Sequence, residues 1–233
     1  MIPQKQLSLA DIFEDCKDIY ESDKPQFLTL LENHIDLDKI IPTSFYKHYY
    51  ASTGRNRKYP LNAMLWALII QRLFSIPTDS LLLIFLHYSR HLREFCGFTK
   101  VPDASKITRF KQDFLMDLQS VFDNLVDITE PICQDIDGNL ASMLLFDTSG
   151  IEAYPGVERG SQEWDDTYKI RVNVEKSINH FKDSFCVAGR KTQNEETLHS
   201  DLLLAGIAQL LTVIVADKIH KHQYIRSLKP LIA

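Results

Sequence analysis

The stretch LLLAGIAQLLTVIVA, residues 202–216, is the longest apolar run without a charged side chain in this sequence of 233 residues. Its 15 residues fall short of the roughly 20 that a membrane-spanning helix needs, and Gln209 and Thr212 interrupt it. We therefore expect a helix buried inside a folded protein. The stretch LNAMLWALIIQRLFSIP, 61–77, has the same character and should end at Pro77. These two helices need each other, or a partner chain, to cover their apolar faces.

The composition is that of an ordinary globular protein, with 45% hydrophobic and 24% charged residues. The first residues, MIPQKQLSLADIFED, lack the basic start and apolar core of a signal peptide. The four cysteines form neither a CxxC pair nor a Cys/His cluster, so we expect neither a zinc site nor a disulfide framework. A reducing, cytoplasmic location fits this usage.

The charge of the chain is distributed unevenly. The net charge of −5 argues against a general nucleic-acid binder. Local charge matters more than the sum, however, when a partner touches only one face. The net charge is −5 over residues 1–40, +7 over 54–111, −12 over 112–167 and +4 over 168–233.

Two further helices are expected in the basic block. SLLLIFLHYSRHLREFCGF, 80–98, is predicted to be one helix with Gly97 as its C-cap. VPDASKITRFKQDFLMDLQSVFDNLVDI, 101–128, carries apolar residues at helical spacing, with Asp103 or Ser105 as its N-cap.

Three helices with a short turn before a basic last helix are typical of a helix-turn-helix arrangement. A helical bundle with merely solvated cations is the alternative. Under the first interpretation, the residues expected to contact DNA are Arg90, Arg93, Lys106, Arg109 and Lys111.

The character of the sequence changes at residue 141. ASMLLFDTSGIEAY, 141–154, has the pattern of strand, tight turn and strand, and predicts a β-hairpin. Asp147 would end a buried strand, where its charge is costly without a partner such as a metal ion. A turn-capping role for Asp147 is the alternative.

A second cluster of polar residues lies in YKIRVNVEKSINHFK, 168–182. Tyr168, Arg171, Glu175 and Lys182 fall on one broad face of a helix at their spacing. This face places one carboxylate between two cations. It suits a site for a metal and a phosphate, and it also suits a solvated helix.

These motifs resemble those of bacterial insertion-sequence transposases. The spacing Y-x2-R-x3-E-x6-K is similar to the signature around their catalytic glutamate, and LLFDTSGIEAY resembles their first catalytic strand. The region from YPLNAMLWALII to TRFKQDF resembles their helical DNA-binding domain, of the InsH-like type. The resemblance covers roughly residues 40–233.

The resemblance implies DDE chemistry on an RNase H-like fold, in which carboxylates hold two divalent metals. It implies that Asp147 and Glu175 are catalytic and ligate Mg²⁺, which prefers oxygen ligands. It also implies that Tyr168, Arg171 and Lys182 contact DNA phosphates.

One part of such an enzyme is missing. Only 28 positions separate Asp147 from Glu175, whereas the remaining strands and crossover of the sheet need roughly 40 residues. Asp165 and Asp166 could replace the middle aspartate, although acids at a helix start more often complement the helix dipole. We therefore hypothesise an internally deleted transposase, joined near 154/155, that does not cleave DNA.

The sequence thus predicts a mainly α protein with a remnant of an α/β domain. An acidic helical arm covers residues 1–40, a helical DNA-binding domain 41–137, and a truncated RNase H-like domain with one β-hairpin 138–233. The expected partner is double-stranded DNA at the ends of an insertion sequence, with this chain or an intact transposase as a possible oligomer partner. The alternatives are a truncated regulator that inhibits an intact transposase, and a helical protein with no role on DNA.

Overall fold

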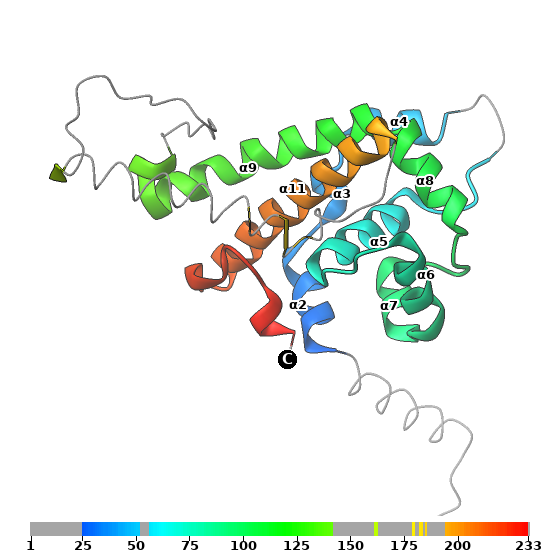
Figure 1. The fold of residues 1–233 in the computed structure, drawn as a ribbon, viewed down its shortest axis with the longest axis horizontal. Coiled ribbons are helices and arrows are strands. Elements are labelled where there is room, and N and C mark those ends of the chain that lie inside the picture. Colours follow the sequence, from blue (N-terminus) through cyan, green and yellow to red (C-terminus); the bar gives the residue numbers. More distant parts are fainter. Residues whose placement is uncertain are drawn as a thin grey trace, which may run out of the picture.

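The computed structural model describes residues 25–51, 56–141, 161–162, 179, 182–183, 185 and 194–232. Within these residues every regular element is a helix, which confirms the mainly α prediction (Figure 1). No strand occurs in this part of the chain. Of the expected hairpin, Ala141 is instead the last residue of a helix, and 142–154 lie outside the described residues.

Three short helices come first: α2 (Gln26–His34), α3 (Leu37–Ile40) and α4 (Thr43–Tyr49). Pro25 and Pro42 stand at the N-caps of α2 and α4, where the missing proline N–H leaves no bond unmade. Each helix turns apolar residues inward, including Leu31 and Phe45, which are both fully buried.

The two apolar stretches form the centre of the fold, as predicted. They become α5 (Leu61–Leu73) and α11 (Glu195–Lys218), which pack against each other. Among the described residues α11 alone is long and apolar enough to cross a membrane, but 72% of its apolar window is buried within the fold. Its length and burial are those of a core helix.

The expected helix over 80–98 is in fact two helices, α6 (Asp79–Tyr88) and α7 (Arg90–Cys96). They meet at Ser89, whose side chain accepts a hydrogen bond from Leu92 N and so begins a new helix. Gly97 ends α7 with φ of 84°, which confirms the predicted C-cap.

The expected helix over 101–128 is also divided, into α8 (Ala104–Asp113) and α9 (Leu115–Ala141). The break is at Phe114, whose ring packs against Phe45 and Tyr49 of α4, with centroid separations of 5.6 and 5.2 Å. Helical spacing persists across a break of one residue, and the sequence pattern therefore did not show it.

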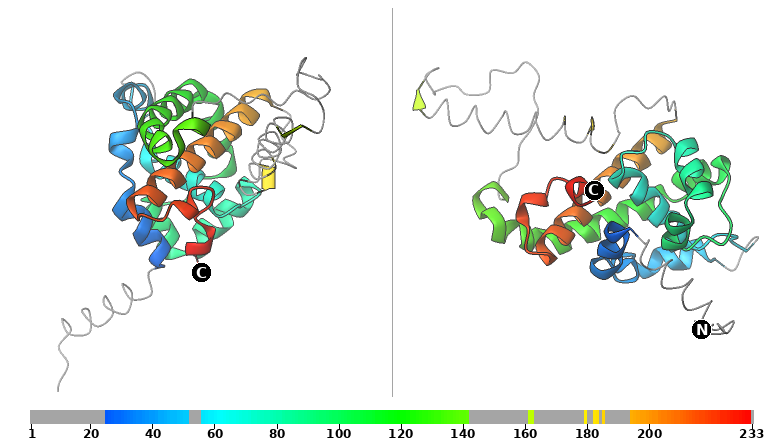
Figure 2. Two further views of the ribbon diagram at one scale, coloured as in Figure 1. Left: turned by 90° about the vertical axis from the view of Figure 1, so that its left-hand side faces the viewer. Right: turned by 90° about the horizontal axis from the view of Figure 1, so that it is seen from below.

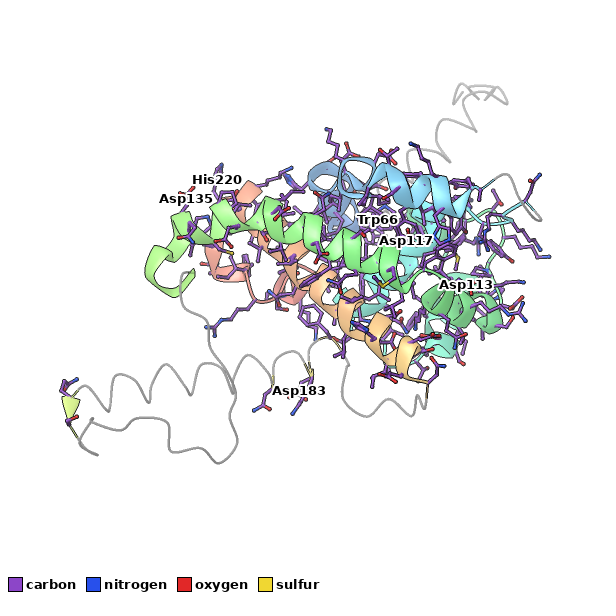
Figure 3. All side chains as sticks on the ribbon, turned by 90° about the horizontal axis from the view of Figure 1, so that it is seen from above. Trp66, Asp113, Asp117, Asp135, Asp183 and His220 are labelled. Carbon is purple, nitrogen blue, oxygen red and sulfur yellow. The ribbon has the colours of Figure 1, made fainter. Side chains whose placement is uncertain are left out.

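Helices α9 and α11 lie side by side and run in the same direction (Figure 2). Near the start of α11, Ser200 Oγ donates to Lys111 O; farther along, Gly206 lies against the ring of Phe122. Figure 3 shows the same order, with Asp117 at one end of the pair and Asp135 and His220 at the other. Because the helices are parallel, the last residue of α9 and the first residue of α11 lie at opposite ends of the pair.

Two short 3₁₀ helices, η1 (His222–Tyr224) and η2 (Lys229–Leu231), follow α11. Gln209, one of the polar residues in the central apolar run, donates from Nε2 to Ile225 O at 2.7 Å. The other, Thr212, donates to Ala208 O within the helix. Both polar groups therefore have partners inside the fold.

Candidate nucleic-acid interface

The helix α8 opens with a complete N-cap. Asp103 Oδ1 accepts from Lys106 N at 3.1 Å and from the hydroxyl of Ser105. The Ser105 hydroxyl is the main reason why the pKa of Asp103 lies below its usual range. Of the two predicted caps, Asp103 is the one used.

The two faces of α8 differ sharply. Ile107 and Phe110 are buried and join the core, whereas Lys106 and Arg109 are exposed. The first turn of the helix proper contains no acidic residue. Lys106 and Arg109, three positions apart, thus share an exposed face of α8. The helix itself lies at one end of the molecule and packs against α6 (Figure 1).

The two arginines of α7 already have partners inside the protein. Arg93 donates from Nη1 to the carbonyls of Leu86 and His87, at 3.2 and 3.1 Å, and so satisfies the end of α6. Arg90 is exposed and bonds Glu94 one turn later, at 2.8 Å. Arg93 is therefore engaged with the backbone at the end of α6, whereas Arg90 remains exposed at the surface.

Lys111 does not lie where the prediction required. Its side chain is fully buried, and Nζ lies 2.8 Å from Asp79 Oδ1 and 2.9 Å from Asp201 Oδ1. An ammonium group enclosed by two carboxylates cannot reach a DNA phosphate from this position. The assignment of Lys111 to DNA contact is therefore corrected: Lys111 joins α8 to α6 and α11.

This lysine belongs to a buried polar network. Arg72 of α5 is also fully buried and pairs with Asp201 through Nη2. Gln71 donates from Nε2 to Asp79 Oδ1 at 3.0 Å. The two buried cations thus contact the buried Asp201 and the partly buried Asp79, as burial of charge demands.

A second group of cations, Arg57 and Lys58, lies on the segment that precedes α5, next to α4 and to the end of α8. The guanidinium of Arg57 lies 5.2 Å from the ring centroid of Tyr49 and 5.0 Å from that of Phe114. Lys58 lies 5.6 Å from the ring of Tyr59. The sequence analysis noted only the charge of this segment; the tyrosines at 49, 50 and 59 were the further signal.

The expected catalytic and metal-binding residues Asp147 and Glu175 lie outside the described residues, as do Tyr168 and Arg171. Lys182 is described and is exposed. Among the described residues, no group of three or more His, Cys, Asp or Glu side chains could hold a metal ion. The prediction of a magnesium site therefore stays a prediction.

Comparison with known families supplies an independent observation. Residues 16–113 match the family model described as a transposase domain, DUF772. This match covers 98 of the 233 residues of the chain, so the similarity to a transposase domain concerns its N-terminal part. The match includes α2 to α8 and therefore every exposed cation of α8. No curated protein and no solved structure matches the chain.

Proposed function

We propose that this protein acts in transposition by binding double-stranded DNA, and that the exposed face of α8 contacts the phosphates. The match of residues 16–113 to a transposase domain carries the proposal. Phosphate contacts supply much of the affinity of a protein for DNA, and lysine and arginine make most of them. Lys106 and Arg109 meet this requirement because both are exposed on one face.

The geometry of α8 also suits this role. Asp103 caps the helix, so the backbone at its start is fixed without using either cation. The buried face is held by the aromatic packing of Phe110 and by Lys111 within its ion pairs. A helix anchored along one side and basic on the other can lie against a duplex without reorganising.

We propose binding without cleavage. By resemblance, Asp147 and Glu175 would hold Mg²⁺ and activate a nucleophile, and the interval between them is too short for the rest of an RNase H-like sheet. Tyr168, Arg171 and Lys182 would then serve, at most, as further phosphate contacts.

The test is a titration of a labelled duplex that carries the terminal repeat of the element, at several salt concentrations, with and without magnesium. We expect salt-sensitive binding and no strand cleavage. Lys106→Glu and Arg109→Glu should each weaken binding and flatten the salt dependence. Lys221→Glu is the matched control, because it makes the same charge change at an exposed site beyond the far end of α11.

Equal effects of all three substitutions would indicate a response to net charge alone and would refute the assignment to α8. Cleavage that depends on magnesium would show that a complete metal site exists, and the proposal of binding without cleavage would fail.

A further inference from the structure

The segment that precedes α5 is held to α4 by three hydrogen bonds. Tyr49 Oη donates to Tyr59 O at 2.8 Å, and Leu61 N donates to Tyr50 Oη at 3.0 Å. Arg57 Nε donates to Tyr49 O at 3.1 Å. Residues 57–61 are thus fixed in place by the end of one helix, and their side chains project from a defined backbone.

Arg57 is positioned by rings as well as by this bond. Its guanidinium lies over Tyr49 and Phe114, and the residue nevertheless stays exposed. Guanidinium has five N–H donors, and the bond to Tyr49 O uses the one at Nε. An arginine held in this way loses little side-chain entropy when it binds an anion.

The position of Arg57 relates it to α8. Phe114, over which it stacks, is the C-cap of α8, so Arg57 lies at the C-terminal end of the helix that carries Arg109. A duplex carries one charge per roughly 1.7 Å of its axis, so a duplex that lies along α8 and continues past its C-terminal end would present phosphates near Arg57 as well.

We propose that Arg57 and Lys58 form a second phosphate-contact site, which binds the backbone of the same duplex that α8 contacts. This inference rests on the proposed function. The site takes a DNA phosphate because it offers two exposed cations on an anchored segment, with aromatic faces beneath them. It extends the interface from α8 to the end of α4.

One carboxylate lies within this path. Asp113, the last residue of α8, is exposed and falls between Arg109 and Phe114 in the chain; Figure 3 labels it close to Asp117. A phosphate backbone that passes from Arg109 to Arg57 would be repelled by it. Its removal should therefore strengthen binding, an effect that a purely structural role of Arg57 does not predict.

The experiment measures the affinity of the full chain for the same duplex between 50 and 200 mM salt. The variants are Arg57→Gln, Lys58→Gln and the double variant, with Lys221→Gln as the matched control. Each lost phosphate contact lowers the slope of log affinity against log salt by about 0.9. Between 50 and 200 mM salt, the factor by which affinity falls should therefore be about 12-fold smaller for the double variant than for the unmodified protein.

Asp113→Asn removes a negative charge and should strengthen binding where the other variants weaken it. We expect this variant to bind the duplex about twofold more tightly at 50 mM salt. Lys58→Gln remains informative if Arg57→Gln fails to fold, because Lys58 is exposed and its ammonium lies over the neighbouring Tyr59 ring, not over the buried Phe114.

The outcomes separate the two proposals. If Lys106→Glu and Arg109→Glu flatten the slope while the Arg57 and Lys58 variants leave it unchanged, the second site is refuted and the function of α8 stands. If none of these variants changes the slope more than its Lys221 control, the proposed function itself fails.

Discussion

Replacement of Asp201 by asparagine should destabilise the protein strongly. Asp201 is fully buried and is the carboxylate that both Arg72 and Lys111 contact. Asparagine keeps the volume of the side chain and removes its charge. Arg72 and Lys111 would then each lose the ion pair with Asp201, while Lys111 would keep its ion pair with Asp79.

The magnitude follows from the two contacts that are lost. A hydrogen bond to a charged group contributes about 1.5–3 kcal/mol, so the pair contributes roughly 3–6 kcal/mol. Breaking a buried ion pair by removing one partner costs about 3–5 kcal/mol, in agreement. For a chain of this length we expect the melting temperature to fall by roughly 6–20 °C.

Urea unfolding followed by far-ultraviolet circular dichroism measures this loss. Asp217→Asn is the control, because Asp217 pairs with His222 at the surface, with side chains 40% and 51% exposed; it should cost less than about 1 kcal/mol. A loss below about 1 kcal/mol for Asp201→Asn would refute the argument from buried charge.

A double variant tests the charge balance directly. Asp201→Leu combined with Arg72→Met removes one cation and one anion and leaves Lys111 paired with Asp79. Apolar residues often replace a buried ion pair without loss. This variant should therefore be more stable than Asp201→Asn, although it carries more substitutions. The reverse order would mean that shape, not charge, determines stability at this position.

Two further predictions concern packing and chemistry. Gly206→Ala should destabilise the protein by about 1–3 kcal/mol, because a Cβ there would lie 2.6 Å from Phe122 Cε2. Gly138→Ala, at an exposed position of α9 where the nearest atom is 3.5 Å away, should instead stabilise the protein by up to about 1 kcal/mol. Equal urea midpoints for the two variants would contradict the close packing at Gly206. Burial raises the pKa of Cys96 to about 12. At pH 8 only about one molecule in 10⁴ therefore carries the reactive thiolate. Iodoacetamide should modify Cys96 only after the protein unfolds, which mass spectrometry can follow.

The sequence predicted the central helices well because their apolar runs are long. A run such as 202–216 has no other way to avoid water than burial, and its pairing with 61–77 follows from the same requirement. The cap at Asp103 and the turn at Gly97 were also predictable, since each depends on one residue type in its local context.

The breaks at Ser89 and Phe114 were not predicted from periodicity, because helical spacing continues across both. Ser89 begins a new helix by capping Leu92 N, and Phe114 packs against α4, which is distant in sequence. Lys111 shows a different difficulty. With Ile107, Phe110 and Phe114 it follows the i, i+3, i+4, i+7 pattern of a buried face. Its partners Asp79 and Asp201 are distant in sequence, so only the folded chain shows why a cation can occupy that face.

The parallel arrangement of α9 and α11 has a consequence for how the protein is made. The helix α11, which closes the core, is synthesised last, about 80 residues after α8 and about 120 residues after α5. At 5–20 residues per second, α5 and α8 leave the ribosome several seconds before α11 can reach them. During that interval the faces of α5 and α8 that α11 covers are exposed, and Arg72 and Lys111 lack the carboxylate of Asp201 that they share. Any product that stops before residue 195 stays in that incomplete state, and we expect it to depend on chaperones or to be degraded.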